Sequence, residues 1–79
     1  MRIDKYLKVS RLIKRRTVAN DAADAGRITV NGKTVKASYD VKIGDVIEIA
    51  FSEKAVKARV LSLAETQKKD EAASMYEII

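Results

Sequence analysis

RITVNGKTVK, residues 27–36, carries the strongest local signal for the fold. Ile28 and Val30 alternate with polar residues, which is the period of a strand with one buried face. The dipeptide Asn31-Gly32 follows, and it favours the two positive φ angles of a type I′ turn. The stretch therefore predicts a β-hairpin whose cross-strand pairs are Val30 with Lys33 and Ile28 with Val35.

Two more strands are predicted downstream of the hairpin. In residues 46–51, VIEIAF, the apolar positions share one face and Phe51 is the last of them. Residues 56–63, VKARVLSL, begin with the same alternation. The connection, residues 36–45, has the composition of a loop and ends in the turn pair Gly44-Asp45.

Two short helices are predicted upstream. Residues 2–9 place Ile3, Tyr6 and Leu7 on one helical stripe. A second helix is expected to begin at Thr17, a good N-cap residue, and to end at Gly26, where glycine favours a left-handed turn. Its apolar side is small, which allows close approach to a neighbour: Val18, Ala19, Ala22, Ala23 and Ala25.

This order of elements predicts one α+β domain, with two short N-terminal helices packed on an antiparallel sheet of about four strands. A chain of 79 residues buries only a thin core. We expect the domain to span residues 1–64, with a tail at 65–79. The tail is either a two-turn helix or an end that orders only on a partner, with the apolar positions Ala72, Met75, Tyr76 and Ile79.

Positive charge is concentrated in the N-terminal half. Residues 1–36 hold ten lysines and arginines against three acids, whereas residues 37–79 hold six against eight. Such asymmetry is typical of proteins that bind nucleic acid or another anionic surface. Because His and Cys are absent, the commonest general base, the thiol nucleophile and the usual zinc ligands are missing. We therefore expect a binding protein and no enzyme, with neither metal nor cofactor.

The basic run RLIKRRT, residues 11–17, needs an anionic partner if it is more than a solvated surface. DNA is unfavourable, because a second helix in the major groove would present the carboxylates of Asp21 and Asp24 to it. A membrane is also unfavourable, because the apolar residues of this half are explained as core and no run is long enough to span a bilayer. Structured RNA remains, with Arg15 and Arg16 just before a helix N-terminus that favours an anion.

Four motifs occur in a characteristic order: RIDKYL at 2–7, SR at 10–11, Arg16 with AxxAAxAGRITVNG at 19–32, and VKASYDVKIGD at 35–45. Together they resemble the RNA-binding domain family named for small-subunit ribosomal protein four, also called the alpha-L motif. The resemblance covers about residues 1–50. It implies RNA contacts at Arg2, Lys5, Arg11 and Arg16, with Lys33 and Lys36 beside the hairpin.

Three further roles complete the predicted site. Arg15 is added because it directly precedes the second helix. Asp4 matches an acidic position of the family, which implies that it orients a neighbouring arginine and does not touch RNA. Tyr39, in a loop expected to be exposed, is a candidate for stacking on a base, whereas Tyr6 is expected at the edge of the core.

Within the family, the chain is most similar to small stand-alone factors of ribosome-associated quality control, and it is related to a fifteen-kilodalton ribosome-binding heat-shock protein. This implies a cytoplasmic protein that binds large ribosomal subunits obstructed by peptidyl-tRNA. It would contact rRNA and tRNA and stabilise the P-site tRNA while an RqcH-type tailing factor adds alanine to the stalled chain. We expect a monomer.

Three alternatives stay open. The first is a general large-subunit-binding heat-shock protein. The second is the RNA-reading module of a modification enzyme such as a pseudouridine synthase, although a chain that starts at Met1 and holds no catalytic domain disfavours it. The third is a protein–protein adaptor whose tail at 65–79 is the interface.

Overall fold

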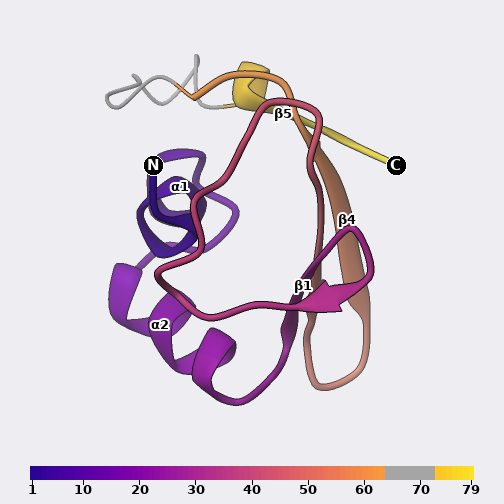
Figure 1. The fold of residues 1–79 in the computed structure, drawn as a ribbon. Helices are drawn as coiled ribbons and strands as arrows, with labels where there is room; N and C mark the ends of the chain where they lie inside the picture. The colour runs from indigo at the N-terminus through magenta and orange to yellow at the C-terminus, as the bar shows by residue number, and fades with distance from the viewer. Residues whose placement is uncertain (64–72) are drawn as a thin grey trace.

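The computed structural model describes residues 1–63 and 73–79, which form two helices on an antiparallel sheet (Figure 1). The helices are α1 (Ile3–Val9) and α2 (Arg16–Asp24). A short 3-10 turn, η1 (Ala73–Met75), precedes the last strand. The sheet has the order β2-β1-β3-β4-β5, with β1 (Ile28–Val30), β2 (Lys33–Thr34), β3 (Val46–Ala50), β4 (Ala55–Val60) and β5 (Tyr76–Ile78). The predicted α+β class is confirmed, with five strands in place of about four.

The β1–β2 hairpin has the predicted register. Val30 pairs with Lys33, and the N–H of Val35 donates to the carbonyl of Ile28 at 3.2 Å. Asn31 and Gly32 have φ angles of 52° and 84°, as a type I′ turn requires. The hairpin then joins the sheet through β1, which pairs with β3.

The core lies between the helices and one face of the sheet (Figure 1). The predicted stripe of α1, Ile3, Tyr6 and Leu7, is fully buried. On α2 the predicted apolar face was too wide: Ala19 and Ala23 are buried, whereas Val18 is half exposed and Ala25 is exposed. Successive residues of a helix are separated by about 100°, so the narrow contact with α1 buries one alanine stripe and leaves Val18 outside it.

Helix α2 ends where predicted but begins earlier. Gly26 has a φ of 74°, and the N–H of Arg27 donates to Ala22 at 2.9 Å in the pattern of a Schellman turn. The N-cap position is Arg15, not Thr17, and no side chain caps it. The start of α2 is therefore not set by a local cap.

The turn between β3 and β4 corrects the prediction for Phe51. Strand β3 ends at Ala50, and the N–H of Phe51 donates to the carbonyl of Lys54 at 2.7 Å to close the turn. Alternation stops where the backbone turns, so Phe51 is 40% exposed and does not join Ile47 and Ile49 in the core.

The C-terminal residues complete the sheet and differ from both structures predicted for the tail. Strand β5 pairs with β4, so that Tyr76 lies opposite Val60. Met75 is fully buried, and its carbonyl accepts hydrogen bonds from the Tyr6 hydroxyl at 2.7 Å and the Leu61 N–H at 2.8 Å. The open edge of β4 offers backbone partners that a helix could not use. Ala72 and the rest of 64–72 lie outside the described residues.

Candidate nucleic-acid interface

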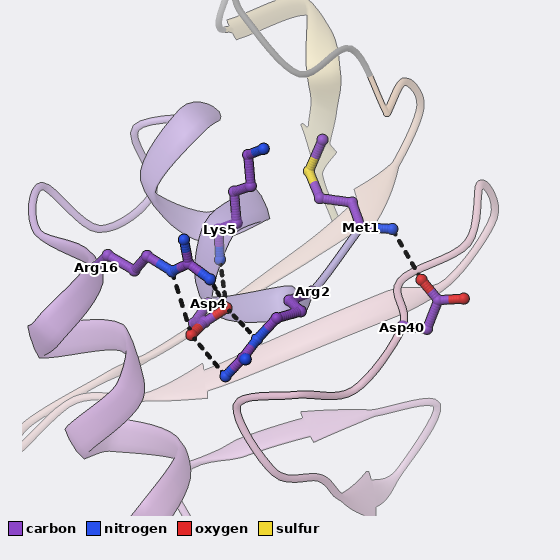
Figure 2. Close-up of polar contacts among 6 residues, drawn as sticks. All are labelled: Met1, Arg2, Asp4, Lys5, Arg16 and Asp40. Carbon is purple, nitrogen blue, oxygen red and sulfur yellow. Dashed lines mark hydrogen bonds and ion pairs between the residues drawn. The ribbon is translucent and has the colours of Figure 1, made fainter.

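Asp4 is the centre of a cluster of charges at the N-terminus of α1. Its side chain is almost fully buried, and its Oδ1 accepts a hydrogen bond from the backbone N–H of Lys5 at 2.7 Å. Two guanidinium groups flank it (Figure 2). The Nε of Arg2 lies 3.3 Å from Oδ1, and the Nε of Arg16 lies 3.3 Å from Oδ2. The predicted role of Asp4, orienting a neighbouring arginine, is thus matched by its geometry, and it engages two arginines.

These partners keep Asp4 ionised. Burial by itself would raise the pKa of the carboxyl group, since it disfavours the charged form. Hydrogen bonds from Arg16 and from the Lys5 N–H, together with the charges of Arg16 and Arg2, outweigh burial and hold the pKa of Asp4 below its usual value. Asp4 is therefore a permanent anionic anchor at neutral pH.

The two arginines face solvent on their other side. The side chains of Arg2 and Arg16 are 52% and 47% exposed, although each is tied to the buried carboxylate. A guanidinium group has five N–H donors, so an ion pair with Asp4 leaves donors for another anion. Arginine pairs well with phosphate in this way, and less rotamer freedom is lost on binding because the side chains are already held.

The ion pair with Asp4 also explains the start of α2. Arg16 is the first residue of the helix, and Figure 2 shows its side chain reaching from α2 to Asp4 on α1. Arg15 precedes it with extended backbone angles and an exposed side chain. A cap at Thr17 would have contributed about 1 kcal/mol. The tertiary contact accompanies a helix start two residues earlier than a cap at Thr17 would give.

Arg11 has an unusual backbone conformation. It follows the C-cap of α1 with a φ of 64°, a left-handed angle that glycine commonly adopts at this position. Its side chain is exposed, whereas Ile13, two residues later, is buried in the core. The basic run is therefore anchored by its aliphatic residues and presents its cations outward, as predicted.

The two hairpin lysines occupy different surroundings. Lys36 directly precedes Ala37, whose carbonyl accepts the N–H of Asp4 at 3.3 Å, so Lys36 lies at the same end of α1 as the arginine pair. The loop is held there by a further ion pair, 2.8 Å between the Met1 ammonium and Asp40 (Figure 2). Lys33 is exposed on the edge strand β2, and among the described residues it forms no ion pair with the Asp4 cluster.

The loop at 36–45 is organised by a carboxylate that sequence reasoning did not single out. Asp45 is 9% exposed and accepts hydrogen bonds from the Tyr39 hydroxyl at 3.1 Å, the Lys42 N–H at 3.0 Å and the Asn31 amide at 3.2 Å. Tyr39 is consequently half-buried, and partial burial with the hydrogen bond to Asp45 raises its pKa. The loop is exposed at most of its positions, as expected, but Tyr39 itself is partly buried, and its engaged hydroxyl weakens the stacking hypothesis.

A surface pocket adjoins the arginine cluster. Its volume is about 300 Å³, and we call it the α2 pocket; its lining residues are Asp4, Arg16, Thr17, Asn20 and Asp21. Among these residues the sequence predicted an exposed carboxylate at Asp21, but no pocket. The spacing of Asn20 and Asp21, three and four residues from Thr17, could have indicated a shared polar face.

The part of the chain that the structure describes contains no helix long and apolar enough to cross a membrane. In the same residues, no three side chains of the types that hold metal ions come together. Arg2 and Arg16, held by Asp4, form the ordered centre of the candidate site.

Comparison with known proteins identifies relatives of the whole chain. The RQC P-site tRNA stabilizing factor of Streptococcus pneumoniae is 57% identical over 79 residues, which are 100% of this chain and 90% of that protein. The factor of the same name from Bacillus subtilis is 57% identical over 79 residues and is covered to 92%. The trimeric structure of Vibrio cholerae Heat Shock Protein 15 matches with a TM-score of 0.91 at 25% identity, covering 100% of this chain and 81% of that one.

The model of the S4 domain family matches residues 1–47, which include α1, α2 and the hairpin. The matched range thus contains every cation of the predicted site. It also contains Asp4, which ties two of those cations together. The chain belongs to the S4 domain family, together with the stabilizing factors to which it is similar over its full length.

Proposed function

We propose that this protein is a non-enzymatic RNA-binding factor of ribosome-associated quality control. It binds large ribosomal subunits obstructed by peptidyl-tRNA and contacts both rRNA and tRNA. It stabilises the P-site tRNA while an RqcH-type tailing factor adds alanine to the stalled chain. It works in the cytoplasm, as a monomer, and needs no cofactor.

The observation that carries this proposal is the buried carboxylate of Asp4 between two half-exposed arginines. A protein that only needed positive charge could place lysines anywhere on its surface. Here Arg2 and Arg16, fourteen positions apart in the sequence, are fixed beside each other by one acid. Fixed guanidinium groups suit the fixed phosphate positions of folded RNA.

The distribution of charge indicates which face of the protein binds RNA. On the solvent face of the sheet, Lys57 lies opposite Glu48, and Arg59 forms an ion pair of 2.8 Å with Glu77. These charges balance, so that face has little attraction for phosphate. The cations of the helical half are balanced by few acids, and RNA is expected to approach there with Arg11, Arg15 and Lys36 around the central pair.

The relatives support the choice of target. Two of them, each 57% identical over the full chain, have names that state stabilisation of the P-site tRNA in RQC. The similarity to Heat Shock Protein 15 supports the alternative of a general large-subunit binder. The two functions differ in one respect: only the first requires a tRNA on the subunit.

The test is co-sedimentation of the protein with three samples: large subunits carrying peptidyl-tRNA, empty large subunits, and duplex DNA. Preferential binding to the obstructed subunits is expected. Arg16→Ala should weaken that binding by about 1–3 kcal/mol, the range for a charge-assisted contact. Lys57→Ala, on the balanced face of the sheet, is the matched control and should change little. Equal binding to all three samples, insensitive to Arg16, would contradict the proposal.

The adaptor alternative needs a test that leaves the fold intact, which removal of the tail does not. Met75 and β5 are part of the folded sheet, so deleting residues 65–79 would damage the domain itself. The exposed Ile78, at 61%, can be replaced by Thr without opening the core. An adaptor that docks through this strand would lose its partner, whereas the proposed RNA binder would keep its affinity for obstructed subunits.

A further inference from the structure

Asp21 opposes the electrostatics of the surface on which it lies. It lines the α2 pocket beside Arg16, where a carboxylate weakens the attraction for phosphate. Its side chain is exposed, and among residues 1–63 and 73–79 it has neither an ion pair nor a hydrogen bond. Nothing in the described fold therefore uses this carboxylate, and a role toward a ligand would explain it.

Two more unpaired polar groups share the pocket with Asp21. Thr17, Asn20 and Asp21 are spaced at i, i+3 and i+4, so they lie on one face of α2. In the described part of the chain, the side chains of Thr17 and Asn20 form no hydrogen bond. No buried polar side-chain atom there lacks a partner, so the amide of half-buried Asn20 must be reachable from solvent. The pocket thus offers a hydroxyl, an amide and a carboxylate together.

On an RNA partner, the groups that can satisfy this carboxylate are neutral donors, because RNA carries no cationic groups at neutral pH. A carboxylate repels phosphate but accepts hydrogen bonds from amino, imino and hydroxyl groups. In a paired RNA helix the Watson–Crick edges are engaged, and the deep, narrow major groove keeps most of the remaining amino hydrogens out of reach of side chains, whereas an unpaired nucleotide exposes its Watson–Crick edge. Arg16 lines the same pocket and keeps donors free for the phosphate of such a nucleotide.

We propose that the α2 pocket binds one unpaired nucleotide of the RNA target. Arg16 holds its phosphate, Asp21 accepts a hydrogen bond from its base, and Asn20 and Thr17 supply further hydrogen bonds to the base or sugar. The proposal rests on the proposed function, and it adds selection of unpaired nucleotides to simple phosphate binding. Asp4 takes no part, because its oxygens are occupied by Arg2, Arg16 and the Lys5 N–H.

The test is whether removing the negative charge of Asp21 strengthens or weakens RNA binding. Asp21→Ala removes a negative charge beside the cations, so phosphate attraction alone predicts tighter RNA binding. Loss of a charge-assisted hydrogen bond to a base instead predicts weaker binding, by about tenfold. The matched control is Asp24→Ala, an exposed acid one turn further along α2 that does not line the pocket. Alanine favours helices, so both variants should fold.

The full chain would be titrated into labelled tRNA, which has unpaired nucleotides, and into a fully paired RNA duplex of equal length. The expected result is a loss of about tenfold for Asp21→Ala on tRNA only, with no loss for Asp24→Ala on either RNA. If the two variants behave alike, or if Asp21→Ala weakens both RNAs equally, the pocket proposal is overturned. Arg16→Ala separates the two proposals: a loss at Arg16 without one at Asp21 overturns the pocket alone, whereas no loss at Arg16, either in this assay or on obstructed large subunits, overturns the proposed function.

Discussion

The Nε of Arg16 lies 3.3 Å from Oδ2 of Asp4, and this ion pair joins the first residue of α2 to the second residue of α1. The acid is buried and the arginine is half exposed. This one contact therefore both joins the two helices and positions a side chain that we propose binds RNA. It ties the first turn of α2 to α1, and it holds a guanidinium group in position to bind phosphate.

Asp4→Asn is expected to weaken binding to obstructed large subunits by about tenfold, because Arg2 and Arg16 would no longer be held before binding. Weaker binding would distinguish this explanation from general electrostatics. The substitution removes a negative charge, so electrostatic attraction alone would strengthen binding to RNA. Affinity is measured by co-sedimentation over a range of protein concentrations, at one salt concentration.

Asp24→Asn is the control for this change in charge, because Asp24 is exposed on α2. It should leave affinity unchanged or slightly raised. Thermal unfolding of both variants shows whether they remain folded under the conditions of the assay. A folded Asp4→Asn protein that binds as tightly as Asp24→Asn would show that the buried acid does not prepare the arginines.

The stability contributed by Asp4 should depend on pH. The pKa of Asp4 is lowered in the folded state, so its contribution is fully present above the ordinary value of 3.8 and is lost as the pH falls through the lower folded value. Urea unfolding of wild type and Asp4→Asn at pH 7 and near pH 3 measures it. The difference in free energy of unfolding between the two proteins should be smaller near pH 3 than at pH 7. An equal difference at both pH values would mean that the charge of Asp4 does not stabilise the fold.

Arg11 is expected to show a conflict between stability and binding. At its φ of 64° a side chain costs about 1 kcal/mol relative to glycine, partly offset by the greater freedom of glycine in the unfolded chain. Arg11→Gly should therefore be at least as stable as wild type yet bind obstructed subunits more weakly. Arg11→Ala, which keeps the strain and loses the charge, should be less stable than Arg11→Gly. Equal binding by all three proteins would remove Arg11 from the interface.

Local patterns predicted the elements that local chemistry determines. Asn31-Gly32 determined the hairpin and its register, the apolar stripe of α1 determined its buried face, and Gly26 determined the end of α2. The same patterns failed at Phe51. The apolar alternation of the sequence continues to this residue, although the strand has already ended and the backbone turns there.

The candidate site was predicted less completely, because its geometry comes from long-range contacts. The sequence indicated which side chains are cationic, and the family resemblance indicated that Asp4 orients an arginine. That two arginines share this acid, and that α2 begins at Arg16 for the same reason, depends on how α1 and α2 pack. The hydrogen bond between Asp45 and Asn31, which are 14 residues apart, and the pairing of the C-terminal strand with β4 depend on the tertiary fold as well.

The hydrogen bond from Tyr6 to the carbonyl of Met75, 2.7 Å long and buried, provides the last prediction. Tyr6→Phe keeps the ring in the core and removes only the hydroxyl, so the free energy of unfolding should fall by about 1 kcal/mol. The carbonyl of Met75 keeps its bonds from the N–H groups of Leu61 and Ser62, which limits the loss. Hydrogen exchange should become faster at those two amides, because the C-terminal residues are held less firmly.

Tyr76→Phe is the control, because Tyr76 lies on the neighbouring strand β5 and is only half-buried. It should leave both stability and exchange at Leu61 nearly unchanged. RNA binding should be the same in both variants, since the arginine pair lies at the N-terminus of α1 and is held by Asp4, not by the hydrogen bond to Met75. If Tyr6→Phe also weakened binding to obstructed subunits, the C-terminal strand would have to support the position of α1, and the site would extend across the core to the last strand of the sheet.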